Sequence, residues 1–466
     1  MAVTAPTRPD RTRPDRKPQT GFARDGATVP GLAARQAAAR LLAAVVEART
    51  PLDGMTDAGH GHPQYRALDE RDRGLVRAIL VSALRHRATI EAMIRERLDR
   101  PLPGNAHMLS HILHVALAQM LFLDIPDSAA VDVAVEQAKA DPRTQRFASL
   151  VNAVLRGVGR DKDEALPRLL AATRDAPDWF IRRVEKAYGK DAMDAILAAH
   201  RLESPVDFTV KSDAAGWAEK LGGTVLPTGS VRIERLDRAV TELPFYAEGD
   251  WWVQDAAAAL PARLMGDVAG KRVADLCAAP GGKTAQLVLA GAKVTAVEIS
   301  ANRLKRLAGN LERLKLDAEL VTADLATYAP AELFDAILLD APCSSTGTVR
   351  RHPDVLWTKT EADITKLADV QRKLLDSAVR LLKPGGTLVF SNCSLDPEEG
   401  EALVRGFLAA TPDMALDPIV ADDAPGIAEF VTPEGFLRTT PAGLAMETPA
   451  MSGLDGFFAA RMRKAA

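Results

Sequence analysis

A turn of small residues between a buried strand and an apolar helix is the feature that most constrains this chain. Residues 271–276 have the apolar content of a buried strand, and the residues that follow are Cys277, Ala278, Ala279, Pro280, Gly281, Gly282 and Lys283. Glycines in such a turn let a ligand approach the backbone at a helix N-terminus. Two phosphate-binding patterns do not fit, because Cys277 stands where a P-loop needs glycine and G-x-G-x-x-G cannot be placed here. The turn therefore predicts a site for a cofactor without phosphates.

Three acidic residues follow at the ends of the next predicted strands. The strands at 293–298, 318–324 and 334–340 end in Glu298, Asp324 and Asp340. Strands and helices alternate here, which is typical of an α/β fold with a parallel sheet, so the three carboxylates are expected at one edge. One such acid is usually a solvated strand end, but three in succession after a glycine turn favour a cofactor site. We expect Glu298 to accept the ribose hydroxyls of S-adenosylmethionine and Asp324 to meet its adenine edge.

The chain has three cysteines, which are too few for a disulfide framework. Cys343 follows the strand that ends at Asp340, and Cys393 ends the run 386–393, so both thiols should converge beside the cofactor. A thiolate that adds to C6 of cytosine turns the poorly nucleophilic C5 into an enamine carbon that can attack a methyl group. Asp340 suits the N3 and amino edge of the base. Cys277 is interpreted as a small turn residue near the cofactor.

At 466 residues the chain exceeds the usual size of one hydrophobic core, so several domains are expected. Residues 1–30 lack apolar periodicity and are predicted to be a flexible tail. The periodicity from 31 to 165 is helical and prolines separate the helices, which predicts an all-α domain. A small α+β linking domain is expected at 166–250, and the α/β domain at 251–466.

Three histidines raise the question of a metal site. His107, His111 and His114 fall on one face of a predicted helix. They alternate with apolar residues, and no cysteine or glutamate stands nearby in the sequence. A structural or RNA-contacting face is therefore favoured, and no metal is expected.

Parts of the chain resemble known families. The segments Leu68-Asp-Glu-Arg-Asp-Arg, Val131-Asp-Val-Ala-Val-Glu-Gln-Ala and Phe147-Ala-Ser-Leu-Val-Asn-Ala-Val-Leu resemble the RNA-binding antitermination factor NusB. Asp275-Leu-Cys-Ala-Ala-Pro-Gly-Gly-Lys-Thr and Asp340-Ala-Pro-Cys-Ser-Ser-Thr-Gly resemble the first and fourth motifs of the Sun-type (Fmu-type) RNA cytosine-C5 methyltransferases. With a NusB-like N-terminal part, the chain is most similar to the RsmB family, which modifies small-subunit (16S) ribosomal RNA.

The resemblance implies a Rossmann-like class I domain that transfers a methyl group from S-adenosylmethionine to C5 of a cytosine. It implies that Cys393 is the nucleophile and that Cys343 assists release of the product. The implied cofactor contacts are the turn from Cys277 to Lys283, together with Glu298, Asp324 and Asp340.

Three features depart from the family. Asn392 precedes Cys393 where threonine is usual, and Glu298 stands where aspartate is common. In the linking domain, Asp207-Phe-Thr-Val-Lys replaces a more usual Arg-Val-Asn ending, which bears on the choice of RNA.

Ribosomal RNA is the expected partner, although the net charge of −3 gives no global signature of nucleic-acid binding. Arg350 and Arg351 follow the Cys343 loop and are the favoured RNA contacts, whereas the basic residues of helix 301–315 are expected on a solvated face. A target base must be unstacked, so the substrate should be a single-stranded or loop segment.

No apolar run is long enough to span a bilayer, which predicts a cytoplasmic protein without a membrane partner. We expect a monomer.

Two alternatives remain open. One is the same chemistry on transfer RNA, which the NusB-like segment disfavours but does not eliminate. The other is a non-catalytic RNA-binding or antitermination factor, and against it stand the intact Cys343, Cys393 and Asp340, which a relic would have no reason to keep.

Overall fold

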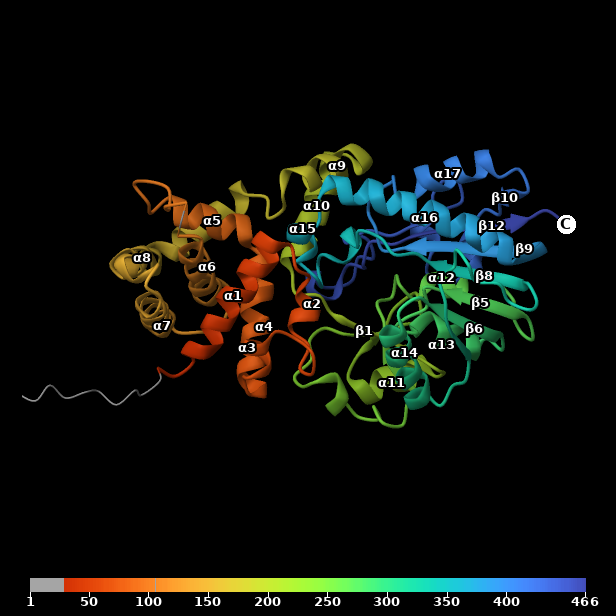
Figure 1. Ribbon diagram of the computed structural model, residues 1–466, viewed down its shortest axis with the longest axis horizontal. Coiled ribbons are helices and arrows are strands. Elements are labelled where there is room, and N and C mark those ends of the chain that lie inside the picture. Colours follow the sequence, from red (N-terminus) through yellow and green to blue (C-terminus); the bar gives the residue numbers. More distant parts are fainter. Residues whose placement is uncertain (1–28, 105) are drawn as a thin grey trace, which may run out of the picture.

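The computed structural model describes residues 29–104 and 106–466, so almost all of the predicted tail at 1–30 lies outside the described residues. Figure 1 shows the N-terminal helices at one end of the long axis and the larger sheet at the other. Helices α9, α10 and α15 lie between these two parts.

The N-terminal part consists of helices packed around α6 (His107–Phe122). Nearly every side chain of α6 from Leu109 to Met120 is buried, because this helix is apolar on almost all sides. The prediction of an all-α segment is confirmed. The other elements are α1 (Leu32–Ala48), α2 (Leu52–Met55), α3 (Pro63–Arg66), α4 (Glu70–Arg85), α5 (Arg87–Arg95), α7 (Asp127–Ala140), η1 (Gln145–Phe147) and α8 (Ala148–Ala172).

Two helices and a small antiparallel sheet follow. The sheet has the order β2-β3-β1-β4, and β4 pairs with β1 in the register Phe208↔Val253. Trp251 and Trp252 therefore belong to this sheet and not to the larger one. The elements are α9 (Asp178–Tyr188), α10 (Lys190–Arg201), β1 (Val206–Val210), α11 (Ala214–Leu221), β2 (Thr224–Val225), β3 (Val231–Ile233), η2 (Val240–Glu242) and β4 (Trp251–Val253).

The larger sheet has the order β10-β12-β9-β8-β5-β6-β7, with β11 paired to β12. The central strands β7, β6, β5, β8 and β9 run parallel. Beyond them, β12 pairs antiparallel with β9, and β10 pairs antiparallel with β12. Its strands are β5 (Arg272–Leu276), β6 (Lys293–Glu298), β7 (Glu319–Thr322), β8 (Phe334–Asp340), β9 (Leu382–Asn392), β10 (Met414–Leu416), β11 (Leu437–Arg438) and β12 (Phe458–Lys464).

The direction of chain progression reverses between β5 and β8. The chain runs outward from β5 to β6 and β7, and then returns to place β8 on the other side of β5. In open α/β sheets a crevice for ligands forms at such a switch point, outside the carboxyl ends of the strands. The turn after β5 and the segment after β8 both begin there.

Helices cover both faces of the larger sheet (Figure 1). Alternate residues of β5 face opposite ways, so Val273 packs with α12 and α13 whereas Ala274 packs with α16 and α17. The helices of this part are α12 (Leu260–Arg263), α13 (Gly282–Leu289), α14 (Ala301–Leu314), η3 (Thr346–Thr348), α15 (Val355–Thr358), α16 (Glu361–Leu381), α17 (Glu401–Ala410), η4 (Ala421–Asp423), η5 (Ala428–Phe430) and η6 (Pro449–Met451).

Candidate active site

The turn after β5 has the tight backbone that its sequence predicts. Cys277 has a φ of 62° and Gly281 a φ of 102°, and Gly282 begins α13. A Cβ atom on Gly281 would lie 2.8 Å from Leu307 Cγ, so a side chain there does not fit unless the turn or the Leu307 side chain of α14 shifts. The turn borders a hollow of about 500 Å³ that is also lined by Asp340 and Cys393.

Asp340 is held between two donors at the end of β8. Lys283 Nζ lies 2.7 Å from Asp340 Oδ2, and the Ser391 hydroxyl donates to Oδ1 at 2.9 Å. The ammonium group of Lys283 also lies 4.9 Å from the centre of the Phe457 ring. These contacts fix the orientation of the carboxylate beside the hollow.

The two predicted thiols converge. Cys343 Sγ and Cys393 Sγ are 3.4 Å apart, although they follow different strands. Parallel neighbours β8 and β9 end side by side, with Asp340 opposite Ser391, which brings the two segments together. The hydrogen bond with Cys393 and burial both raise the pKa of Cys343 well above its usual value.

The other predicted acids occupy different surroundings. Glu298 is buried at the end of β6, with Arg303 Nη1 at 3.4 Å from its Oε2. Asp324 is exposed, and its Oδ1 accepts the backbone N–H of Ala326 at 2.9 Å. Neither residue is among those that line the hollow.

Cys277 lies apart from the other two cysteines. It packs against the apolar core between the sheet and α16, and burial raises its pKa to about 12. A thiol in this state is a poor nucleophile, in line with its interpretation as a turn residue.

The expectation that Arg350 contacts RNA is wrong, because that side chain is buried, whereas the expectation for Arg351, which lines the hollow, stays a prediction. The side chain of Arg350 is 3% exposed and donates to Asp455 Oδ1 at 2.8 Å. Both guanidinium groups donate to Asp255 Oδ2, at 2.6 and 2.5 Å. The sequence shows that the two arginines follow the Cys343 loop. It does not show their carboxylate partners, because Asp255 lies about a hundred residues before them and Asp455 about a hundred residues after them.

The basic residues of α14 also differ in part from the expected solvated face. Arg303, Lys305 and Arg306 are exposed as expected, although Arg303 Nη2 also donates to the carbonyl of Ala279 in the glycine turn at 2.9 Å. Arg313 is only partly exposed, and its Nη1 donates to Tyr246 O at 2.8 Å. These two arginines therefore fasten α14 to the turn and to the linking part.

Several residues that line the hollow were not singled out from the sequence. Asp275 lies in β5 and Phe457 precedes β12, while Trp252 and Gln254 come from the end of β4. The apolar run that begins at Phe457 was a signal for an additional strand, and the pairing of that strand with β9 brings Phe457 to the site.

The three histidines are structural where they are buried. His111 Nε2 lies 2.8 Å from Glu47 Oε1, and burial lowers the pKa of His114 to about 3. His107 is exposed. Among residues 29–104 and 106–466, no group of three or more His, Cys, Asp or Glu is arranged to hold a metal ion. Within the same residues, no helix is long and apolar enough to cross a membrane.

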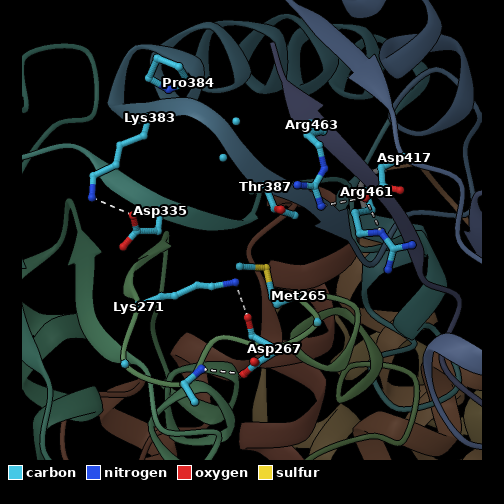
Figure 2. Close-up of a pocket in the computed structure, with 15 residues that line it drawn as sticks. Met265, Asp267, Lys271, Asp335, Lys383, Pro384, Thr387, Asp417, Arg461 and Arg463 are labelled. Carbon is cyan, nitrogen blue, oxygen red and sulfur yellow. Dashed lines mark hydrogen bonds and ion pairs between the residues drawn. The ribbon is translucent and has the colours of Figure 1, made fainter. Parts of the chain in front are cut away.

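A larger hollow, of about 790 Å³, opens at the opposite edge of the sheet, near the amino ends of β5, β8 and β9 (Figure 2). Its cations face carboxylates: Lys383 Nζ lies 2.7 Å from Asp335 Oδ1, and Arg461 Nε lies 3.1 Å from Asp417 Oδ2. The described residues that line it include none of the predicted site residues. The smaller hollow at the carboxyl ends is therefore the candidate active site.

Comparisons with known proteins give matches to two families. Residues 263–463 match the family described as 16S rRNA methyltransferase RsmB/F, and residues 32–160 match the NusB family. The ribosomal RNA small subunit methyltransferase B of Cronobacter sakazakii is 34% identical over 421 residues, with 86% of this chain and 93% of that protein covered.

Two solved structures share the fold. The crystal structure of PH0851 has a TM-score of 0.70 at 23% identity and covers 94% of this chain and 99% of that chain. A methyltransferase homolog from Pyrococcus horikoshii has a TM-score of 0.50 at 28% identity, with 61% of this chain and 94% of that chain covered.

Proposed function

This chain belongs to the RsmB/F family of 16S rRNA methyltransferases, and we propose that it methylates C5 of a cytosine through a covalent cysteine–C6 adduct. Membership makes the chain a ribosomal RNA methyltransferase that uses S-adenosylmethionine. The observation that carries the finer proposal is the pair of thiols 3.4 Å apart beside Asp340. A methyltransferase that acts on an amino group needs no such pair, whereas addition to C6 needs a nucleophile and a second group for release.

The residues around the turn fit this cofactor. Glu298 Oε2 and Asp275 Oδ1 are buried and accept no hydrogen bond from the described residues. Glu298 would accept the ribose hydroxyls, the turn from Cys277 to Lys283 would contact the amino-acid end, and Asp324 would meet the adenine. When bound, S-adenosylmethionine supplies an electrophilic methyl group on a sulfonium centre.

Lys283 and Asp340 would orient the cytosine. Lys283 and Ser391 leave Asp340 as a fixed acceptor for the amino edge of the base. Fixing the base in this way sets C6 in reach of a sulfur atom and lowers the entropic cost of the attack.

The two thiols would divide the covalent steps. The Cys393 thiolate forms a bond to C6, and the electron pair of the C5–C6 double bond moves to give an enamine, whose C5 takes the methyl group. A base such as a water molecule then takes the C5 proton, and the electron pair of the broken C–H bond restores the C5–C6 double bond and expels the Cys393 thiolate, a release that Cys343 assists. The enzyme returns to its starting state because one proton leaves and one methyl group arrives at C5.

Trapping of the adduct tests this proposal. Cys393→Ala should form neither product nor adduct, because no sulfur adds to C6. Cys343→Ala should attack and methylate and then stall, which leaves protein bound to RNA as a slow band on a denaturing gel. The double variant should lack that band, and Cys277→Ala, the matched control, should give no stalled adduct. An adduct that accumulates in Cys393→Ala but not in Cys343→Ala would reverse the two roles.

We also propose a single-stranded or loop segment of small-subunit ribosomal RNA as the substrate. The support is the family match and the NusB-like residues 32–160, which are the natural candidate for RNA binding. Bisulfite sequencing of total RNA from cells with and without the gene identifies the methylated cytosine. A site lost only from transfer RNA would favour the alternative substrate.

A further inference from the structure

One buried carboxyl group joins the two segments that carry the thiols. Glu399 lies between β9 and α17 and is 0% exposed. Its Oε1 accepts the backbone N–H of Ser344 at 2.9 Å, and its Oε2 accepts the hydroxyl of Ser394 at 2.6 Å. Ser344 and Ser394 are the residues immediately after Cys343 and Cys393. A single side chain therefore contacts both cysteine segments, and it is not among the residues that line the hollow.

Further hydrogen bonds hold this carboxyl group in place. The side-chain amide of Gln371 in α16 donates to Glu399 Oε1 at 2.9 Å and to Pro342 O at 3.0 Å. The Ser344 hydroxyl also donates to Oε2, and Thr346 Oγ1 lies 3.2 Å from both serine hydroxyl oxygens. A buried carboxyl group is costly unless such donors surround it, so these contacts favour a single orientation of the Glu399 side chain.

The residue that departs from the family pattern belongs to the same arrangement. Asn392 donates its side-chain amide to the backbone carbonyl of Glu399 at 2.7 Å, and its Oδ1 accepts the N–H of Ser394 at 3.0 Å. A backbone hydrogen bond also joins the two segments, because Gly347 N–H donates to Cys393 O at 2.9 Å. Loss of the Glu399 side chain therefore loosens the two segments without releasing them entirely.

We propose that Glu399 is a positioning residue that sets the separation of the two sulfur atoms by holding Ser344 and Ser394. This inference rests on the proposed function, since it assigns both thiols to one reaction. Attack by one sulfur and release assisted by the other require the two to reach the same base in turn. A displacement of about 1 Å in such a site is enough to cost roughly a hundredfold in rate.

Substitutions at Glu399 separate positioning from substrate binding. Glu399→Gln keeps the shape and one acceptor, but its NH₂ group cannot accept from the serine hydroxyls. Glu399→Ala removes every bond of the side chain. We expect kcat to fall about tenfold in Glu399→Gln and about a hundredfold in Glu399→Ala. The KM for RNA and the Kd for S-adenosylmethionine should stay within about twofold, because Glu399 touches neither ligand.

Glu398→Gln is the matched control. Glu398 is the preceding residue and pairs with Arg183 at 2.7 Å on the surface side of the same loop, so its kcat should stay close to that of the parent. If Glu399→Ala does not fold, Ser394→Ala removes one of the Glu399 hydrogen bonds, together with the bond that Ser394 Oγ accepts from the backbone N–H of Asp396 and its contacts with Ser344 and Thr346. It should still lower kcat several-fold at unchanged KM.

Two results would overturn the inference. One is an unchanged kcat in folded Glu399→Gln and Ser394→Ala. The other is an equal loss of cofactor affinity, thermal stability and kcat, which is what general support of the fold would give. Failure of the proposed function is visible separately, because Cys343→Ala would then form no adduct whatever the behaviour of the Glu399 variants.

Discussion

Asp275 and Asp340 end up with different surroundings although both lie at the carboxyl edge of adjacent strands. Asp340 has Lys283 and Ser391 as donors. Asp275 is 1% exposed, and among the described residues only the Thr284 hydroxyl donates to its carboxylate, at 2.6 Å. Burial raises the pKa of Asp275 to about 7, and the negative charge of Asp340 adds to this rise. The free protein therefore holds a proton on Asp275 at mildly acidic pH.

This shift predicts a pH-dependent stability. The usual pKa of 3.8 applies in the unfolded chain, which loses the Asp275 proton as the pH rises above about 4, while the folded chain keeps it until about 7. Ionisation of Asp275 in the folded protein therefore lowers the free energy of unfolding progressively between about pH 4 and about pH 7. Asp275→Asn removes the cost, so its free energy of unfolding relative to the parent should rise from about pH 4 to about pH 7. Urea unfolding of cofactor-free protein at several pH values measures the difference.

Asp335→Asn is the matched control for that experiment. Lys383 lowers the pKa of Asp335 in the folded chain. The ionised Asp335 therefore stabilises the folded state at pH values above the unfolded pKa, and this stabilisation is lost as the pH falls through the folded pKa. Relative to the parent, the Asp335→Asn variant should therefore lose stability only as the pH rises towards about 4, and its difference from the parent should stay constant between about pH 4 and pH 7, where that of Asp275→Asn changes. A constant difference between parent and Asp275→Asn across the window would show that Asp275 is ionised throughout.

For single residues, the sequence predicts which side chains are reactive better than it predicts which partners each side chain contacts. Cys343 and Cys393 were found because parallel strands end at one edge, which is a general rule of the fold. Arg350 was misjudged because its charge is visible in the sequence, whereas Asp255 and Asp455 are brought to it only by folding. Glu399 was missed for the same reason: nothing local shows that a glutamate five residues after Ser394 turns back to bind it.

The turn after β5 is the element on which the cofactor site depends. Gly281 has a φ of 102°, which side chains of L-residues rarely adopt, and it packs against Leu307 of α14. The turn is thus positioned by the neighbouring helix as well as by its own sequence. Any side chain at Gly281 would have to push the turn or the helix aside.

Gly281→Ala is therefore predicted to weaken cofactor binding. The positive φ and the 2.8 Å contact of the added Cβ with Leu307 Cγ both oppose the native turn. We expect a stability loss of about 1–2 kcal/mol and a clear loss of affinity for S-adenosylmethionine, measured by urea unfolding and calorimetric titration. Gly309→Ala in α14 is the control, because an added Cβ there meets nothing within 4 Å, and it should stabilise the helix slightly. Equal affinities in the two variants would contradict the role of the turn.

Local patterns predicted the elements of the α/β part but not their pairing. The alternation of strands and helices at 271–340 indicated parallel strands, and β5, β6 and β8 are parallel. The apolar run at Phe457 indicates the strand β12 itself, but no local pattern indicates that it pairs antiparallel with β9, which lies far away in sequence. Trp251 and Trp252 were assigned to the α/β part because they stand next to it, whereas their hydrogen bonds to β1 place them in the small sheet.

The N-terminal helices contact the segment that follows Cys343. The indole of Trp357 donates to Leu84 O at 3.0 Å, and Arg85 Nη2 donates to Arg350 O at 3.1 Å. Asp354 Oδ2 accepts the backbone N–H of Leu52 at 3.0 Å. The NusB-like part therefore contacts the segment that follows Cys343 directly.

Trp357 is the residue that tests whether this contact matters for catalysis. It packs against the apolar core of the N-terminal helices, and the guanidinium of Arg87 lies 5.4 Å from its ring centre. Trp357→Ala removes the packing and the hydrogen bond, so we expect a stability loss of roughly 2 kcal/mol for this partly buried ring. We also expect a lower kcat on ribosomal RNA at unchanged affinity for S-adenosylmethionine, because the loop moves while the turn after β5 does not. Trp357→Phe keeps the packing and loses only the bond to Leu84, so its kcat should be intermediate. If Trp357→Ala is less stable but methylates ribosomal RNA at the parental rate, the N-terminal helices contribute to RNA binding alone and not to the geometry of the loop.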